Sequence, residues 1–200
     1  MKTIITISRQ YGSGGREIGR KLAEQLGVPF YDNEIISRAA KETGFSEAAF
    51  ETVEDKATNS LLYSIAMGMN VFTNQDAGFA GLSLDDRIFL AQSNVIRKVA
   101  EEGGCVIVGR CADFILQDRT DCLKVFIHAD MDFRARRIVE VYGEREQSPE
   151  ERLRDKDKRR AAYHRFYTDM KWGYAQNYHL TLNSGVLGID QCVKIIASLY

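Results

Sequence analysis

The sequence predicts an α/β fold with a parallel sheet, and three observations lead to that prediction. Short apolar runs rich in β-branched residues alternate with longer segments in which apolar residues recur at helical spacing. Each predicted strand is brief and apolar, which is typical of a sheet covered by helices on both faces. The composition, with 44% hydrophobic and 28% charged residues, is that of a globular chain that can bury a sizeable core.

The predicted elements alternate from the start of the chain. Residues 4–8 form a strand, a glycine-rich turn follows, and a helix then runs to Gly27, a residue type that commonly ends helices. Residues 29–31 form a short second strand, after which Asp32 can cap a helix. Further strands are predicted at 105–108, 123–128 and 179–183, and further helices at 85–99, 130–142, 148–167 and 189–199.

Two of these helices carry start signals. Asp85 can cap the helix that contains Ile88, Val95 and Val99. Ser148 and Glu151, with proline between them at the first helical position, have the spacing of a capping box. We therefore expect a side-chain cap at both starts.

Charge and cysteine content exclude several classes of protein. The 27 basic residues nearly balance the 28 acidic ones, so the chain has no general attraction for nucleic acid or an anionic membrane. No apolar run approaches the roughly 20 residues of a membrane span. The four cysteines have no CxxC or zinc-ligand spacing, which indicates small core residues in a reducing, cytoplasmic setting. We expect no nucleic-acid partner and no membrane partner.

The turn after the first strand is the first candidate for function. A glycine-rich turn that leads from a strand into a helix leaves backbone N–H groups that can hold a phosphate, and Arg16 adds a forked positive charge. The match to the P-loop pattern GxxxxGK[ST] is incomplete. Arg9 stands at the first glycine, Gly14 at the second, Gly15 at the lysine and Arg16 at the Ser/Thr position. A tight turn without a ligand is the alternative.

The chain resembles the cytidylate kinase-like family, a branch of the nucleoside monophosphate kinases. The resemblance rests on five stretches in the family's order and extends over nearly the whole chain except about residues 46–85. These stretches are residues 12–32 with the Asp32–Ala39 segment, Val106–Arg110, Phe126–Ala129 followed by Arg134, Arg136 and Arg137, Asp157–Tyr163, and Leu182–Asn183.

The resemblance implies a fold and an activity. The fold is the three-layer P-loop NTPase fold, with a five-stranded parallel sheet and helices on both faces. It forms a single domain over 1–200, with a helical insertion for the monophosphate at about 46–102 and a lid at about 134–155. The activity is transfer of a phosphoryl group from ATP, with Mg²⁺, to a nucleoside monophosphate, for which CMP is the first candidate.

The glycine-rich turn and the family resemblance together indicate candidate site residues. Those expected to bind ATP phosphates are Gly12, Ser13, Gly14, Gly15, Arg16 and Glu17. Those expected to act in catalysis are Arg16, Asp32, Arg134 and Arg137. Those expected to bind the acceptor are Arg38, Arg110, Asp113, Asp157 and Arg160. Ser13 is the candidate metal ligand, because the Ser/Thr of the consensus is absent.

Several of these residues also have an ordinary structural role open to them. Nine of the seventeen arginines lie between Arg134 and Arg165, and they can close over phosphates or form a solvated face paired with glutamates. Asp157 and Arg160 can be a surface ion pair, and Asp32 can serve only as a cap. The aromatic side chains of Tyr11, Tyr163 and Tyr167 can stack on a base or pack in the core.

Three functions remain open at this point. The first is a kinase that uses ATP on a nucleoside monophosphate. The second is a nucleotide- or phosphate-binding sensor without catalysis, which the altered turn favours. The third is a kinase for a small molecule that is not a nucleotide. The Met- and Gly-rich stretch at 60–85 is a candidate surface for homo-oligomer formation.

Overall fold

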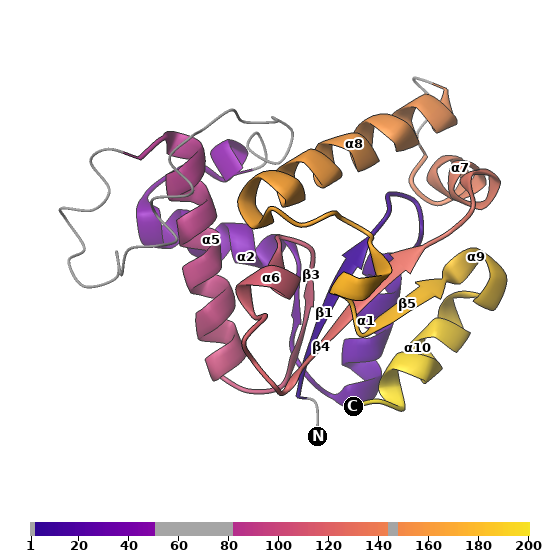
Figure 1. Ribbon diagram of the computed structural model, residues 1–200, viewed down its shortest axis with the longest axis horizontal. Coiled ribbons are helices and arrows are strands. Elements are labelled where there is room, and N and C mark those ends of the chain that lie inside the picture. Colours follow the sequence, from indigo (N-terminus) through magenta and orange to yellow (C-terminus); the bar gives the residue numbers. More distant parts are fainter. Residues whose placement is uncertain (1–2, 51–81, 144–147) are drawn as a thin grey trace.

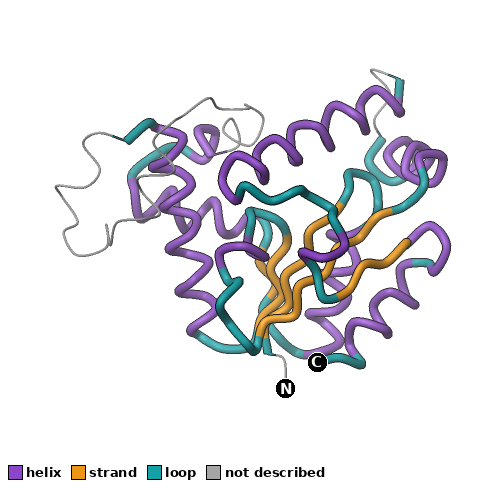
Figure 2. The backbone as a smooth tube through the Cα atoms, viewed as in Figure 1, coloured by secondary structure: helices purple, strands orange, loops and turns teal. Residues whose placement is uncertain are grey.

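Five parallel strands form one sheet in the computed structural model, which describes residues 3–50, 82–143 and 148–200 (Figures 1 and 2). The strands are β1 (Ile4–Arg9), β2 (Phe30–Tyr31), β3 (Cys105–Val108), β4 (Cys122–His128) and β5 (Leu180–Asn183). Their order across the sheet is β2-β3-β1-β4-β5. All four pairings are parallel, so the predicted α/β architecture is confirmed.

Helices cover both faces of the sheet. In the described part of the chain the longer helices are α1 (Gly15–Leu26), α2 (Asn33–Thr43), α5 (Leu84–Glu101), α7 (Met131–Glu140), α8 (Pro149–Thr168) and α10 (Ile189–Ala197), and the short ones are α6 (Ala112–Ile115), α9 (Ser184–Leu187) and the 3-10 turn Ala175–Asn177. Alternate residues of β1 face opposite sides. Ile5 and Ile7 pack with α1 and α10, whereas Ile4 packs with α2 and α5. The result is the expected three-layer arrangement.

The helix α1 follows the predicted pattern closely. Ile18 and Leu22 are fully buried against the sheet. Gly19 faces Val108 so closely that an added Cβ would lie 2.8 Å from the valine side chain. Gly27 ends the helix in the left-handed conformation, and its N–H binds the carbonyls of Ala23 and Glu24. The predicted role of Gly27 as the C-cap is confirmed.

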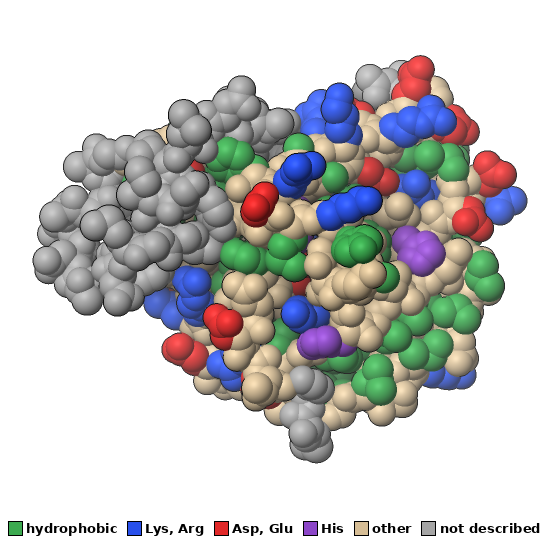
Figure 3. Space-filling view, viewed as in Figure 1, with side chains coloured by type: hydrophobic (Ala, Val, Ile, Leu, Met, Phe, Trp, Pro, Cys, Tyr) green, Lys and Arg blue, Asp and Glu red, His purple; other side chains and the backbone are tan. Residues whose placement is uncertain are grey.

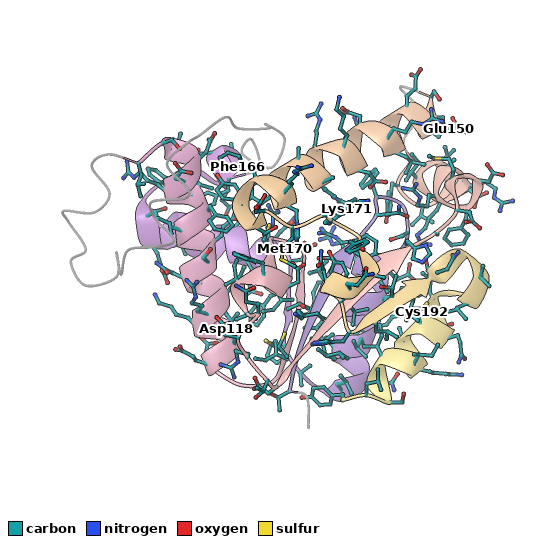
Figure 4. The ribbon with its side chains drawn as sticks, viewed as in Figure 1. Asp118, Glu150, Phe166, Met170, Lys171 and Cys192 are labelled. Atoms are coloured by element: carbon teal, nitrogen blue, oxygen red, sulfur yellow. The ribbon has the colours of Figure 1, made fainter. Side chains whose placement is uncertain are left out.

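The long helix α8 lies over the carboxyl-terminal edge of the sheet (Figure 1). Figure 4 labels Glu150 and Phe166 near its opposite ends, with Met170 and Lys171 on the segment that follows it. Near its end Tyr167 stacks on Phe89 of α5 at 4.0 Å, and Tyr163 lies edge-on to the same ring. Tyr163 and Tyr167 are both buried in this core, which favours packing over the alternative of stacking on a base.

Three helix starts differ from the prediction. Ser83, not Asp85, caps α5, since its hydroxyl accepts from the N–H of Asp86. The capping box at α8 does not form: the Ser148 hydroxyl accepts no backbone N–H, and it donates to the Glu150 carboxylate. Asp32 occupies the N-cap position of α2 without a side-chain cap, since its carboxylate is engaged elsewhere.

The predicted insertion is only partly covered by the described residues. Residues 51–81, and with them most of the stretch at 60–85, lie outside that part of the chain. Its last helix, α5, buries Ile88, Val95 and Ile96 in the core beside α2.

All four cysteines are buried and unbridged, including Cys192 of α10 (Figure 4). Among the described helices none combines the length and the hydropathy that crossing a membrane would require.

Candidate functional site

A pocket of about 300 Å³ opens at the carboxyl end of the sheet, between the β1–α1 loop, the start of α2 and α8. Its lining residues are Arg9, Gln10, Tyr11, Gly12, Gly14, Gly15, Arg16, Asp32, Asn33, Arg110, Tyr142 and Arg160. Four of them are arginines and only one is acidic. In the space-filling view, Lys and Arg side chains gather over α8 near this edge (Figure 3). The charges of the lining give +4 − 1 = +3, which suits a polyanionic ligand.

Two glycines of the loop adopt backbone conformations that other residues rarely reach. Gly12 and Gly14 have φ angles of +76° and +79°. At Gly12 an added Cβ would also lie 3.0 Å from the carbonyl oxygen of Arg134. The loop then delivers the chain into α1, whose first-turn N–H groups have no partners within the helix. These features make the turn a suitable anion site.

Ser13 is turned away from this pocket. It is fully buried, and its hydroxyl donates to the carbonyl of Gln10 at 2.8 Å. The hydroxyl of Ser184 in turn donates to the carbonyl of Ser13 at 2.6 Å. Because the Ser13 hydroxyl already serves the loop's own backbone, it is not directed at the space where a metal-bound phosphate would lie.

Arg16 and Asp32 form an ion pair in the wall of the pocket. The Arg16 Nε lies 2.6 Å from the Asp32 carboxylate, and the Arg9 guanidinium lies 3.9 Å from the other carboxylate oxygen. The Asp32 side chain is only 6% exposed, whereas Arg16 is 62% exposed. A buried carboxylate therefore holds two arginines at the pocket, and the exposed one has room to turn toward a ligand.

Arg9 occupies the position of the first consensus glycine, and its side chain passes between two other glycines. An added Cβ at Gly15 would lie 2.5 Å from the Arg9 Cβ. At Gly109 an added Cβ would collide with the Arg9 guanidinium. The absence of a side chain at position 15 makes room for the Cβ of Arg9, whereas at position 109 only the flexible guanidinium end of Arg9 would have to move.

The turn after β3 brings Arg110 to the pocket through an unusual backbone. Gly109, Arg110 and Cys111 follow one another with φ angles of +75°, +58° and +55°. Arg110 is buried, and it lines the pocket together with the partly buried Arg9 and Arg160. Beyond these arginines lies a small inner cavity of about 30 Å³, enough for about one water molecule.

A buried polar network lies behind this cavity. His164, which lines it, has its Nε2 atom 3.0 Å from the Asp113 carboxylate and its Nδ1 atom 3.1 Å from the Thr168 hydroxyl. Asp113 itself lines neither cavity. The sequence favoured Asp113 as an acceptor ligand. The structure instead makes Asp113 the partner of His164, which only the long-range fold reveals.

Arg38 lies apart from the pocket. Its guanidinium pairs with Glu34 at 3.2 Å and Glu102 at 3.5 Å, and it lies 5.0 Å from the centre of the Tyr31 ring. Burial raises the pKa of Tyr31, and the nearby Arg38 charge opposes that rise. The structure thus places Arg38 in a surface ion-pair cluster, separate from the pocket-lining residues.

The predicted lid residues bind the loop from outside. Arg134 contacts Asp157, and Arg137 contacts Glu17 beside Gly14. None of these four charged residues lines the pocket. Arg160, one turn after Asp157 on α8, does line it, donates to the carbonyl of Arg9 at 3.2 Å and lies over the Tyr11 ring.

The structure therefore brings together part of the predicted set. The predicted residues that line the pocket are Gly12, Gly14, Gly15, Arg16, Asp32, Arg110 and Arg160. Sequence reasoning did not nominate Arg9, Asn33 or Tyr142. The position of Arg9 directly after the strand was the available signal for Arg9. For Tyr142, whose ring lies 5.9 Å from that of Tyr11, the sequence gives no signal.

The site offers few donor groups to a metal ion. The described residues contain no cluster of three His, Cys, Asp or Glu side chains suited to a metal ion. Asp32 is the one carboxylate among the pocket-lining residues. Mg²⁺ at phosphate-transfer sites is commonly held by one or two carboxylates together with substrate phosphates and water, and a single Asp32 fits that pattern.

Comparison with known proteins agrees with this geometry. The model of the cytidylate kinase-like family matches residues 4–186. The chain belongs to the cytidylate kinase-like family. An uncharacterized protein from Eubacterium ventriosum has a solved structure that is 29% identical, with a TM-score of 0.72 and coverage of 99% of this chain and 98% of that one. The curated proteins gave no match.

More distant structures show the same fold. The shikimate kinase from Acinetobacter baumannii, solved with shikimate, is 17% identical, with a TM-score of 0.52 and coverage of 100% of this family member and 93% of that chain. The shikimate kinase from Bacteroides thetaiotaomicron is 16% identical, with a TM-score of 0.52 and coverage of 98% of this chain and 97% of that one. The predicted P-loop kinase fold is therefore confirmed.

Proposed function

We propose that this family member is a small-molecule kinase that transfers the γ-phosphoryl group of ATP to a phosphorylated acceptor. The observation that most directly supports this proposal is that one pocket is lined by the glycine loop and by four arginines, Arg9, Arg16, Arg110 and Arg160. Phosphoryl transfer demands little covalent chemistry from a protein, but it requires several cations around the phosphates. A lining charge of +3 supports that chemistry.

The two sides of the pocket suit different ligands. The loop and the first turn of α1, with Arg16, suit the ATP phosphates. Arg110 and Arg160 lie deeper and suit the phosphate of the acceptor. In the reaction, an acceptor oxygen bonds to the γ-phosphorus, the bond to the β-phosphate oxygen breaks, and ADP leaves. The arginines stabilise the charge on the transferring group.

Mg²⁺ would be held by the Asp32 carboxylate, directly or through water, and by the phosphates of ATP. When bound, the ion would neutralise charge on the β- and γ-phosphates. Asp32 now pairs with Arg16 and Arg9. We expect the exposed Arg16 to leave the carboxylate and turn to the phosphates when nucleotide binds.

CMP is the first candidate acceptor because of the family, and a non-nucleotide acceptor is the second. The specific observation in favour of the second is that Tyr163 and Tyr167, two of the candidate base-stacking residues, are buried in the core. Tyr11 and Tyr142 remain at the pocket as aromatic surface for a base.

An ADP-release assay with ATP, Mg²⁺ and a panel of acceptors tests the proposal. The panel contains the nucleoside monophosphates and phosphorylated small molecules without a base. Turnover with CMP supports the first candidate, and turnover only with a non-nucleotide supports the second. ATP binding without turnover on any acceptor would indicate the sensor. Arg160→Ala should raise the KM for the acceptor, whereas its neighbour Arg159, which pairs with Asp155, gives the control variant Arg159→Ala.

A further inference from the structure

The Tyr11 peptide groups are held by two charged residues from outside the loop. The Tyr11 N–H donates to one oxygen of the Asp157 carboxylate at 2.7 Å. The Arg134 guanidinium donates to the second oxygen at 2.5 Å and to the Tyr11 carbonyl at 3.2 Å. The three groups come from α8, α7 and the loop, and they form a closed set of hydrogen bonds that we call the Tyr11 clamp.

The charges of the clamp are balanced within it. Arg134 is 6% exposed and Asp157 is 17% exposed, so the pair is largely removed from water. An acidic side chain beside a phosphate site would normally weaken anion binding by repulsion. Here the buried Arg134 neutralises Asp157, so the carboxylate can bind the loop without adding net negative charge to the pocket.

The clamp also determines where the next N–H group points. In a trans peptide the C=O and N–H groups point in opposite directions, and all described peptides are trans. Because the Tyr11 carbonyl faces Arg134 on the α7 side, the N–H of Gly12 faces away from α7. Gly12 lines the pocket, so the clamp fixes the orientation of a peptide group at the pocket wall.

The same turn of α8 also holds the ring of Tyr11. Arg160 follows Asp157 by three residues, lies 5.1 Å from the centre of the Tyr11 ring and donates to the Arg9 carbonyl. One helical turn therefore contacts both the loop backbone and the inner end of the pocket.

We propose that Asp157 is a positioning residue for the phosphate-binding loop, which it sets through the Tyr11 peptide. This inference rests on the proposed function only in taking ATP as the ligand. The hydrogen bonds of the clamp do not depend on it. It assigns to Asp157 a role on the donor loop in place of the expected contact with the acceptor. A preorganised loop binds phosphates more tightly because it need not be ordered on binding.

The test compares ATP binding by calorimetry in wild type, Asp157→Ala, Asp157→Asn and the control Asp155→Ala. Asp155 lies on the same helix but pairs with Arg159. We expect Asp157→Ala to weaken ATP binding about tenfold, as loss of a charged hydrogen bond would. Asp157→Asn should fall in between, because its amide oxygen can still accept from Tyr11. Asp155→Ala should bind like wild type, and equal affinity of all four proteins would overturn the inference.

Hydrogen exchange of the Tyr11 amide gives a second readout that needs no ligand. In wild type this amide should exchange slowly, and in Asp157→Ala it should exchange fast while amides of β1 stay protected. If Asp157→Ala does not fold, the wild-type measurement still decides, since fast exchange at Tyr11 would contradict the clamp. If wild type fails to bind ATP, the proposed function is wrong, while slow exchange at Tyr11 would still support the clamp.

Discussion

Arg16 and Arg20 lie one turn apart on α1, have the same exposure and differ in what they face. Both side chains are 62% exposed, but Arg16 pairs with the pocket carboxylate Asp32 and Arg20 with Glu24. Only the first is within reach of a bound phosphate. The local sequence predicted the position of Arg16 at the helix start, because a strand, a glycine turn and a helix need no long-range information.

Replacing Arg16 therefore tests the donor side of the pocket. We expect Arg16→Ala to weaken ATP binding by about 1–3 kcal/mol, since a charge-assisted contact is lost. Isothermal titration gives the measurement, with Arg20→Ala as the matched control. Unchanged affinity in Arg16→Ala would remove this residue from the site.

A second prediction at this scale concerns the buried pair of Asp113 and His164. Asp113→Ala leaves the imidazole without its carboxylate partner in a site where both side chains are under 5% exposed. The expected loss is about 1–3 kcal/mol of unfolding free energy, the cost of leaving a buried polar group without its hydrogen-bond partner. Urea unfolding measures it, and the exposed Asp118, labelled in Figure 4, gives the control Asp118→Ala. A loss as small as that of the control would show that the pair contributes nothing to stability.

At the scale of an element, the glycine loop combines a left-handed backbone with close packing. Gly27 has a similar φ of +66° but nothing near the place of a Cβ. Gly27→Ala should thus cost only the backbone strain, about 1–2 kcal/mol. Gly12→Ala carries the same backbone strain and also brings the new Cβ close to Arg134. It should therefore lower the unfolding free energy more than Gly27→Ala does, and it should weaken ATP binding as well. Thermal unfolding and titration of both variants check this, and equal effects would contradict the close approach.

The contact of Asp121 with Arg119 and Thr3, at the start of β1 and β4, should depend on pH. Hydrogen bonds from Arg119, and then from Thr3, lower the pKa of Asp121 from 3.8 to about 2. A lowered pKa in the folded state means that the carboxylate stabilises the fold above about pH 4. That contribution is lost as the pH falls toward about 2.

Asp121→Asn should consequently be less stable than wild type at neutral pH and lose less stability on acidification. Unfolding free energies measured between about pH 6 and pH 2 give the two slopes. Asp118→Asn is the control, because that side chain is exposed. Parallel slopes for wild type and Asp121→Asn would show that the contact does not stabilise the folded state.

For the whole molecule, a ligand that joins the loop, α2 and α8 should raise the stability of the fold. At 100 times its Kd, a ligand that binds only the folded state adds about 2.7 kcal/mol. Thermal unfolding with ATP should show this rise, and adenosine, which lacks phosphates, should show little. An equal shift with adenosine would mean that the arginines are not the binding groups.

The sequence allowed much of this architecture to be predicted, and the limits are physical. Strand and helix patterns and Gly27 depend on local periodicity and backbone preference, and they are confirmed. The contact of Asp157 with Tyr11 spans 146 residues, and that of His164 with Asp113 spans 51. No local spacing encodes such pairs. The predicted Ser148 cap was wrong, and in the structure that hydroxyl donates to the carboxylate of Glu150, two residues away.

The passage of Arg9 between Gly15 and Gly109 links three positions that are distant in sequence. An arginine at position 9 is compatible only with glycine at 15, where the P-loop consensus has lysine, because the two Cβ atoms would otherwise overlap. The departures from that consensus at positions 9 and 15 are thus coupled. In relatives with glycine in place of Arg9, we expect a larger residue to become permissible at position 15. Position 109 should stay glycine, because its positive φ favours glycine whatever residue stands at position 9.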